Sequence, residues 1–329
     1  MPWRSTLRDT ARWNPTAATG RRGAARERRS GSPRLATARY VPARTANLRS
    51  VTTTPAPVTL HDVTRAFEEI YPPAWAADWD AVGLVCGDPA QQVRRILFAV
   101  DPVAAVVDEA AAWGADLIIT HHPLLLRGVT SVAATTPKGR LVHRLISSGI
   151  ALYTAHTNAD TAAPGVSDAL AAAVGLDGDL RPLDPDPTDA EGRRGIGRIG
   201  TLPRPMALRE FAAQAAAGLP GTAVGIRVSG DLDRQVRTVA VSGGAGDSLL
   251  GAARAAGVDV YLTSDLRHHP ASEFAEHDDT ALIDTAHFAS EWPWLADGAA
   301  RLRSALGGER ANVETRVSTT VTDAWSQTF

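Results

Sequence analysis

The 329-residue chain lacks several features that would define a class of protein. Cys86 is the only cysteine, which excludes an internal disulfide or a thiolate metal cluster and suits a reducing cytoplasm. No stretch approaches 18 uninterrupted apolar residues, so no membrane span is predicted. Hydrophobic residues make up 44 % of the chain and charged residues 21 %, a balance typical of soluble globular proteins.

The common motifs of nucleotide binding and covalent catalysis are also missing. No G-x-G-x-x-G or G-x-x-x-x-G-K-[ST] follows a predicted strand, which argues against dinucleotide or P-loop binding. There is no G-x-S-x-G of a serine hydrolase. Cys86 has no identifiable basic partner, and we expect it to be buried. The glycines of SGGAG (242–246) could seat a phosphate on backbone N–H groups, or simply turn the chain from strand to helix.

Positive charge is concentrated at the amino terminus. Residues 1–50 hold twelve arginines against Asp9 and Glu27, and the segment shows no apolar periodicity that could build a core. We expect residues 1–57 to be a disordered Arg-rich leader that follows from a start codon assigned too far upstream. The alternatives are an organelle transit peptide and a basic arm for nucleic acid. The remainder is acidic, so nucleic-acid binding is not expected, and without an apolar secretion signal the cytoplasm is the default location.

From Val58 onward, strand and helix patterns alternate. The stretch 58–72 predicts a helix that begins near a Thr59 to Asp62 cap. Apolar runs at 93–101, 115–123 and 150–160 predict strands, and amphipathic segments lie between them. This alternation predicts an α/β fold with parallel or mixed sheets.

The pattern then recurs along the chain. VRTVAVSGG (236–244) and VDVYLTSD (258–265) each lie 143 residues after their counterparts at 93–101 and 115–122. ALYTAHTNAD (151–160) aligns with LIDTAHFASE (282–291) at an offset of 131, which places His156 over His287 and Asp160 over Glu291. We therefore predict two related α/β lobes, 58–180 and 181–329, with the Pro- and Asp-rich stretch 181–197 at the boundary.

Histidines and carboxylates follow the predicted strands, where ligands of doubly wound sheets bind. His121 and His122 end one strand, and adjacent strand residues point apart, so each could reach a different metal ion. His287 and Glu291 are spaced i, i+4 and could share an ion on one helix face. The alternatives are histidines that only cap a strand and a carboxylate that only interacts with a helix dipole. Nitrogen and oxygen donors suit zinc, manganese, iron, cobalt or nickel.

Six segments, taken together, resemble the NIF-three-like dinuclear-metal-centre family, whose members are often described as homologues of the type 2 form of GTP cyclohydrolase 1. The resemblance covers about Val58 to Trp325, and its segments are WDAVGLVCGDP, DLIITHHPLL, TAHTNAD, YLTSDLRHHPA, DTAHFASE and VSTTVTDAW. The chain departs from the family pattern at Ala81, Ser264 and His268, where the family commonly has Asn, Gly and Tyr. These departures bear on substrate contacts and remove no ligand.

The resemblance implies two α/β lobes with a pair of divalent metal ions in the cleft between them, and a toroidal homohexamer. The metal ligands that it implies are His121, His122, Asp160, His287 and Glu291, the last as a bridge. It places His156 beside the site, where that side chain could fix a ligand or move a proton. Asp265 and His269 match a polar motif near the pocket, and His269 is a second candidate for proton transfer.

The function predicted from these features is that of a two-metal hydrolase acting on a nucleotide or a phosphoester-like small molecule. The alternative is a non-catalytic, metal-dependent hexameric scaffold or regulatory binding protein. The sequence shows no purine pocket, so the substrate rests on the resemblance alone.

Overall fold

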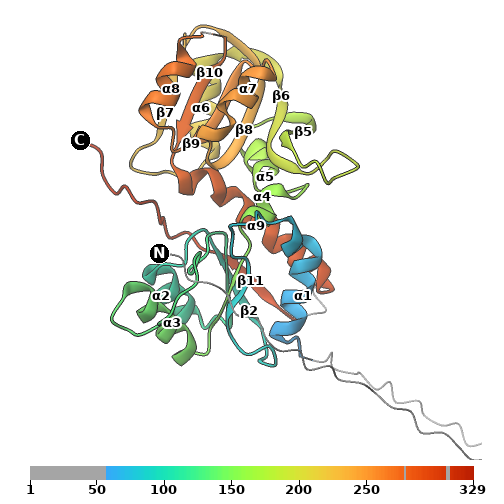
Figure 1. Cartoon of the computed structure of the whole chain (residues 1–329), viewed down its shortest axis with the longest axis vertical. Helices are drawn as coiled ribbons and strands as arrows, with labels where there is room; N and C mark the ends of the chain where they lie inside the picture. Colours follow the sequence, from blue (N-terminus) through green and yellow to red (C-terminus); the bar gives the residue numbers. More distant parts are fainter. Residues whose placement is uncertain (1–56, 278, 309–311) are drawn as a thin grey trace, which may run out of the picture. The chain divides into compact units, whose positions relative to one another are not determined.

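The computed structural model describes residues 57–277, 279–308 and 312–329. The predicted leader therefore lies, apart from Pro57, outside the described residues. Across the described ranges the chain forms two mixed sheets with helices packed against them (Figure 1). The predicted α/β fold with two lobes is confirmed.

The first sheet has the strand order β1-β4-β3-β2-β11. Its strands β2, β3, β4 and β11 run parallel, and β1 pairs antiparallel with β4 at one edge. Helices α1, α2 and α3 belong to this lobe. The bounds are β1 Gly83–Cys86, β2 Arg95–Ala99, β3 Leu117–Thr120, β4 Ala151–Thr154, β11 Glu314–Val317, α1 Leu60–Ile70, α2 Ala104–Trp113 and α3 Pro137–Ser147.

The second sheet has the order β5-β6-β8-β9-β10-β7. Its strands β8, β9 and β10 run parallel, in the same sequential order as β2, β3 and β4 of the first sheet, and the outer strands are antiparallel. The bounds are β5 Asp177–Pro185, β6 Gly195–Ala207, β7 Ile226–Ser229, β8 Gln235–Ala245, β9 Val260–Ser264, β10 Ala281–Thr285, α6 Leu208–Gly218, α7 Leu250–Ala255 and α8 His268–Ala275. Short 3-10 turns stand at Pro73–Trp75 and Asp247–Leu249.

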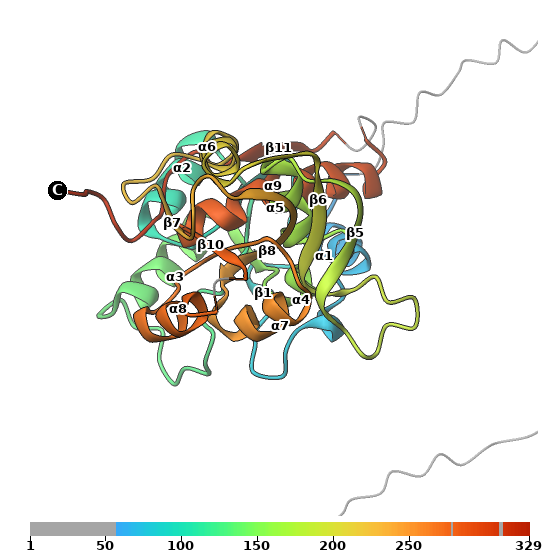
Figure 2. The same ribbon diagram turned by 90° about the horizontal axis from the view of Figure 1, so that it is seen from above.

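The central strands of the second sheet are buried on both faces, as a covered parallel sheet requires. Val239 and Val241 of β8 pack with α6, whereas Ala240 between them packs with α7 and α8. Figure 2 shows α7 and α8 on one side of this sheet and α6 on the other. Strands that are buried on both faces consist of continuous apolar runs, and this made them predictable from the sequence.

Local capping confirms the start of the first helix. Thr59 accepts a hydrogen bond from the Asp62 backbone N–H at 3.2 Å, and the Asp62 carboxylate accepts from the Thr59 N–H at 3.0 Å. This reciprocal pair satisfies two N–H groups that the first turn leaves without helical partners. The helix then buries Val63 and Phe67 on the face that the periodicity predicts.

Residues 181–197 were predicted to form a loop, but only the middle of this stretch lies outside the strands. β5 continues to Pro185 and β6 begins at Gly195, so the two strands form a hairpin around a shorter loop. β5 lies at the sheet edge with β6 as its neighbour, where Pro182 and Pro185 can lack an N–H without breaking a ladder. The predicted lobe boundary at 180/181 thus falls inside β5.

Helix α9 (His287–Ala305) packs in both cores. Ala289, in its first turn, packs among the residues of the second sheet. Trp294 and Leu302 pack in the first core with the aromatic ring of Phe67. The chain then returns to the first sheet as β11, although this strand lies in the range 181–329 predicted for the second lobe. Short helices α4 (Thr157–Thr161) and α5 (Val166–Ala173) lie beside α9 in Figure 1.

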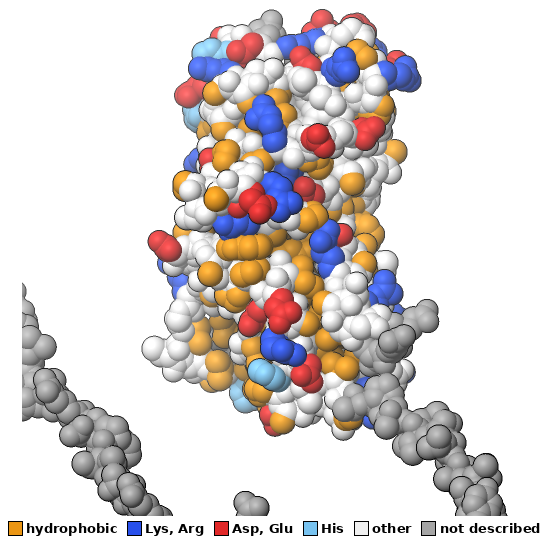
Figure 3. Space-filling view, turned by 90° about the vertical axis from the view of Figure 1, so that its right-hand side faces the viewer, with side chains coloured by type: hydrophobic (Ala, Val, Ile, Leu, Met, Phe, Trp, Pro, Cys, Tyr) orange, Lys and Arg blue, Asp and Glu red, His pale blue; other side chains and the backbone are white. Residues whose placement is uncertain are grey.

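Some large apolar side chains remain on the surface. Trp79, Ile146 and Trp325 are each more than 60 % exposed. The face drawn in Figure 3 carries a band of hydrophobic side chains across its middle, with acidic and basic groups on either side. Within the described residues, no helix combines the length and the apolar character needed to cross a membrane.

Candidate metal centre

The paired histidines stand at the end of a buried strand, as predicted. β3 is buried at all four positions, and its ladder with β2 continues into the pair. The His121 N–H donates to Ala99 O at 3.1 Å, and the His122 N–H donates to Val100 O at 2.9 Å. The backbone of both residues is therefore fixed. Their rings nevertheless lie close together, with 5.1 Å between the centroids, so the divergence expected of neighbouring strand residues is not found.

The Glu291 carboxylate lies among three imidazole rings. Its Oε1 is 2.9 Å from His287 Nε2 and 3.4 Å from His121 Nε2, and its Oε2 is 3.1 Å from His122 Nε2. The carboxylate is 3 % exposed. His287 and Glu291 share one face at the start of α9, so the predicted i, i+4 pair is present.

Asp160 and His156 complete the cluster from the short helix α4. Asp160 Oδ1 is 3.7 Å from His121 Nε2. His156 forms the N-cap of α4, and its ring nitrogen lies within 4.8 Å of ligand atoms of His121 and His122. All five side chains predicted as ligands are therefore brought together, with His156 beside them.

A carbonyl or carboxylate oxygen contacts the Nδ1 atom of each imidazole. The partners are Asp101 for His122 at 2.7 Å, Asp265 for His287 at 2.7 Å, Asp80 for His156 at 2.9 Å and the Ala155 carbonyl for His121 at 3.0 Å. A donated Nδ1–H leaves the Nε2 lone pair free for the centre and fixes the ring. This is the usual arrangement around metal-binding histidines.

Two of these supporting carboxylates were not assigned a role from the sequence. Asp101 is recognisable only as a polar residue after a strand, and Asp80 lies in a turn far from His156 in the chain. Asp80 also accepts hydrogen bonds from the backbone N–H and the hydroxyl of Thr157, at 3.0 Å and 2.5 Å. No spacing rule links positions this far apart, so only the fold reveals the contact.

His269 does not join this cluster. It lies in the exposed first turn of α8, where its ring contacts that of His268, with 5.2 Å between the centroids. The cluster instead uses Asp265 from the same segment of sequence. The role of His269 in proton transfer stays a prediction.

The buried carboxylate and the surrounding imidazoles shift one another's pKa values. Burial alone would raise the pKa of Glu291, but the neighbouring histidines hold it well below its usual range. Burial disfavours the charged form of His122, yet Glu291 and Asp101 raise its pKa to about 11. The same opposition raises the pKa of His287 to about 10, through Glu291 and Asp265. The neighbouring carboxylates therefore favour the protonated forms of these two histidines when no metal ion is present.

Asp160 and His156 shift toward their neutral forms. Burial raises the pKa of Asp160 to about 6, and attraction to His121 offsets this only in part. Burial, together with repulsion from His121, lowers the pKa of His156 to about 4 against the opposing effect of Asp80. His156 is thus a neutral imidazole at pH 7, with one nitrogen directed to Asp80.

The donor set fits divalent cations. His121 Nε2 and Glu291 Oε2 are buried, and neither has a hydrogen-bond partner among the described residues. Two groups of donors lie close enough together to hold an ion, His121 with His122 and His156, and His122 with His287 and Glu291. Imidazole nitrogen and carboxylate oxygen suit zinc and other first-row metals. A cation would satisfy the two unpartnered atoms and offset the buried charge.

The glycines of residues 242–246 lie against this centre. Gly244 has φ +70°, and a Cβ there would come within 2.6 Å of Glu291 Oε1. Its N–H donates to Ser290 Oγ at 2.9 Å, and the Gly246 N–H donates to Ser264 O at 3.1 Å. Residues 242–245 form the irregular end of β8, where Gly244 makes room for Glu291. Because these N–H groups are used inside the protein, the phosphate interpretation is disfavoured.

Two cavities reach the cluster. One, of about 690 Å³, is lined by His156, Asp160 and Glu291 together with Trp75 and Trp79. The other, of about 880 Å³, is lined by His122, Asp265 and residues near the carboxyl terminus. His287 borders both. Small molecules therefore have room on either side of the histidine and glutamate side chains.

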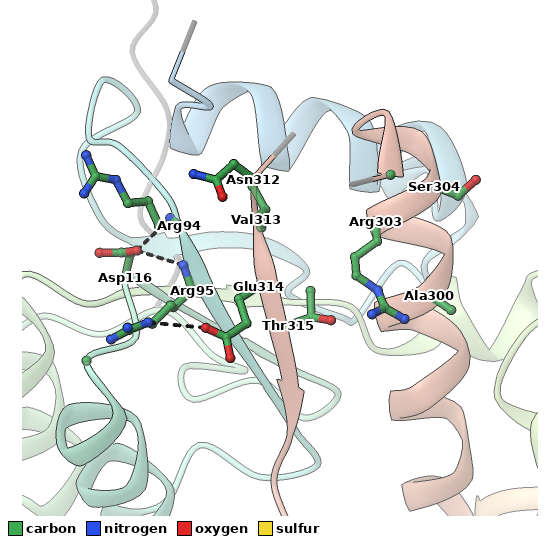
Figure 4. A pocket seen from close by; sticks show the side chains of 12 residues that line it. Arg94, Arg95, Asp116, Ala300, Arg303, Ser304, Asn312, Val313, Glu314 and Thr315 are labelled. Carbon is green, nitrogen blue, oxygen red and sulfur yellow. Dashed lines mark hydrogen bonds and ion pairs between the residues drawn. The ribbon is translucent and has the colours of Figure 1, made fainter. Parts of the chain in front are cut away.

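A further cavity, of about 1010 Å³, lies at the amino-terminal ends of the first sheet's strands, where Arg95 opens β2 and Glu314 opens β11 (Figure 4). Several of its charged groups have partners within the protein. Arg95 Nε is 3.5 Å from Glu314 Oε2, and Asp116 accepts the backbone N–H groups of Arg94 and Arg95. None of the predicted ligands lines it.

Cys86 takes no part in the cluster. It is half-buried in β1 rather than fully buried as predicted. Burial raises the pKa of its thiol, so the reactive thiolate is disfavoured.

The fold is mixed α/β with two sheets, and it carries a buried group of histidines and a glutamate. These two features place the chain in a class of proteins that could bind a metal ion. Residues 58–324 match the profile of Duf34/NIF3 (NGG1p interacting factor 3). The chain belongs to this family, and the family resemblance predicted from the sequence is confirmed.

Relatives and solved structures agree with this assignment. A Streptomyces coelicolor protein named GTP cyclohydrolase 1 type 2 homolog is 58 % identical over 267 residues, which cover 81 % of this chain and 93 % of that protein. A Mycobacterium tuberculosis protein of the same name is 40 % identical, with 82 % of this chain and 97 % of that protein covered. The crystal structure of a Bacillus cereus protein related to NIF3 matches with a TM-score of 0.75 and 25 % identity, covering 82 % of this chain and 99 % of that one.

Proposed function

We propose that the chain is a metal-dependent hydrolase with a dinuclear centre. The observation that carries the proposal is the buried Glu291 carboxylate, which faces three imidazole nitrogens within 3.4 Å. A buried charge of this kind is costly unless it is paired or coordinates a metal.

The five clustered side chains would hold two divalent ions. His121, His122, Asp160 and His287 would supply ligands to the ions, with Glu291, which faces three of these imidazoles, as a shared carboxylate ligand. The ions would supply Lewis acidity, which would lower the pKa of a water molecule and polarise a carbonyl or phosphoryl oxygen. Zinc, manganese, iron, cobalt and nickel all suit the nitrogen and oxygen donors.

His156 is placed to accept a proton beside the ions. Its low pKa keeps the ring neutral at pH 7. If its Nδ1–H is donated to Asp80, the Nε2 lone pair remains available on the side of His121 and His122. A neutral imidazole within reach of the attacking water can take the proton that hydrolysis releases.

The cavity of about 690 Å³ suits a small substrate with a planar ring. Trp79 is 62 % exposed at this cavity, and its ring lies edge-on to that of His156, with 5.9 Å between centroids. An exposed aromatic face offers stacking area. Together with the names of the relatives, this supports a nucleotide or phosphoester-like substrate.

The test is turnover after defined metal loading. Metal-free protein is reconstituted separately with each of the five metals and assayed against nucleotides and phosphoesters. We expect at least one metal to support hydrolysis. His122→Ala should abolish it, whereas His143→Ala, on the exposed side of α3, should not. Absence of turnover with every metal across that panel would contradict the hydrolase.

The second candidate is a non-catalytic, metal-dependent hexameric scaffold or regulatory binding protein. The hydrophobic band of Figure 3 supports it, because contiguous apolar surface commonly marks an interface. In this case His122→Ala should disrupt the assembly. If the variant remains assembled and loses only turnover, the scaffold is rejected and the hydrolase is supported.

A further inference from the structure

The segment that follows β11, Ser318–Phe329, reaches the metal centre. The Thr322 hydroxyl donates a hydrogen bond to Asp101 Oδ2. The other oxygen of the same carboxylate, Oδ1, contacts His122 Nδ1 at 2.7 Å. A single chain of contacts therefore runs from the C-terminal segment through Asp101 to a predicted metal ligand.

The segment is fixed at its beginning by the first sheet. The Ser318 N–H donates to Phe98 O at 2.7 Å, and its carbonyl accepts from Trp292 Nε1 at 2.9 Å. The hydroxyls of Ser318 and Thr320 both donate to Glu109 Oε2, at 2.6 Å and 2.8 Å. These anchors hold the segment over the carboxyl end of β2, where Asp101 stands.

The rest of the segment crosses to the second lobe. The Thr328 hydroxyl donates to Ala223 O, ahead of β7. Between these ends, Thr322, Ala324 and Trp325 line the cavity of about 880 Å³ that His122 and His287 also line. The segment therefore forms one wall of an approach to the metal centre.

Hydrogen bonds rather than apolar burial hold this wall in place. Trp325 is 68 % exposed, Val321 is 51 % exposed and Phe329 is fully exposed. A segment with few buried apolar contacts opens at low free-energy cost. Its position can consequently respond to changes at the residues that it contacts.

We propose that the C-terminal segment positions the metal site, with Thr322 fixing Asp101 and Asp101 fixing His122, so that docking of the segment and metal binding favour each other. The proposal rests on the proposed metal centre. Without the Thr322 hydroxyl, one oxygen of Asp101 loses its partner and the carboxylate can rotate away from the His122 ring. Mutation of residues that hydrogen-bond to metal-bound histidines typically lowers the metal affinity about 10- to 100-fold. Coupling between two binding events is reciprocal, so the metal stabilises the docked segment in turn.

The first test compares variants of two threonines in the segment. Thr322→Val removes the hydroxyl that contacts Asp101 but keeps the shape of the side chain. Thr320→Val removes an equivalent hydroxyl that contacts Glu109 instead. Full-length proteins are titrated with Co²⁺ against a chelator, and the cobalt absorption spectrum is recorded. We expect Thr322→Val to weaken binding about 10- to 100-fold and to change the spectrum, with Thr322→Ser restoring both and Thr320→Val matching the unmodified chain.

The second test measures the reverse effect. Chymotrypsin cleaves after exposed aromatic residues, and Trp325 is such a residue. Co²⁺ should slow cleavage at Trp325 in the unmodified chain and have little effect in Thr322→Val. This measurement also applies if Thr322→Val is partly misfolded, because Thr322→Ser should then retain the protection.

The outcomes separate this inference from the proposed function. If Thr322→Val binds Co²⁺ with unchanged affinity and spectrum, or if Thr320→Val weakens binding equally, the positioning role is wrong and the metal centre stands. If the unmodified chain binds no metal, both are wrong.

Discussion

At the scale of single residues, the metal-free protein disfavours the negative charge of Asp160 but favours the positive charge of the histidines around Glu291. Burial raises the pKa of Asp160 to about 6, so its charged form predominates at pH 7 but is held at a desolvation cost. The histidines around Glu291 instead gain protons. A bound cation would oppose both pKa shifts, because it favours charged carboxylates and neutral imidazoles.

Asp160→Asn should therefore stabilise the metal-free protein while weakening metal binding. The folded pKa of Asp160 is raised above its unfolded value of 3.8. Its favourable contribution is complete below pH 3.8 and is lost as the pH rises through about 6. At pH 7 the substitution should add on the order of 1–3 kcal/mol to the free energy of unfolding, measured by urea denaturation in a chelator. Asp233→Asn, at an exposed position, serves as the control. A destabilised, metal-free Asp160→Asn would contradict this account.

Metal affinity should rise with pH. His122 and His287, with pKa values of about 11 and 10 without metal, must lose protons to become ligands. Calorimetric titration with Zn²⁺ in buffers of different ionisation enthalpy should show proton release between pH 6 and 8. The same high pKa values stabilise the metal-free fold fully below pH 6.5 and progressively less as the pH rises toward 10 and 11. Metal binding without proton release would show that the histidines are not the ligands.

At the scale of elements, the irregular end of β8 determines whether Glu291 can occupy its position. Gly244→Ala adds a Cβ within 2.6 Å of Glu291 Oε1, at a backbone φ of +70°. We expect at least a tenfold loss of metal affinity, with circular dichroism showing that the fold is kept. Gly251→Ala in α7 is the matched control, because nothing lies within 4 Å of its Cβ. Equal affinity of the two variants would mean that the end of β8 does not constrain the site.

The periodicity of the chain predicted the elements that are buried on both faces. β3, β9 and β10 are buried along their whole length, and their apolar runs are unmistakable. The same logic failed at β5, where an edge strand tolerates the prolines that otherwise indicate a loop. It also gave no reason to place β11 in the first sheet, because strand order depends on contacts between distant segments.

The candidate metal ligands were easier to predict than the residues that hydrogen-bond to them and orient them. Spacing made His121, His122 and Glu291 candidates, and the resemblance to the family implied the full ligand set. Asp80 and Thr322 act through hydrogen bonds to residues 76 and 221 positions away, and no local pattern encodes such a contact. Sequence reasoning therefore found the groups that converge on the centre and missed those that orient them.

At the scale of the whole molecule, we predict a homohexamer. The hydrophobic band of Figure 3 supports this prediction, because contiguous apolar surface commonly marks an interface. Light scattering coupled to size-exclusion chromatography should give about six times the chain mass of 34.7 kDa. A mass equal to one chain at micromolar concentration would contradict the prediction.

The central claim is that the buried histidines and carboxylates bind two metal ions. Elemental analysis after incubation with Zn²⁺ and gel filtration tests it most directly, with Glu291→Gln beside the unmodified chain and Glu276→Gln, at an exposed position, as the control. We predict about two ions per chain in the unmodified protein and in Glu276→Gln, and fewer than one in Glu291→Gln. Equal metal content in all three proteins, or none in any, would contradict the account.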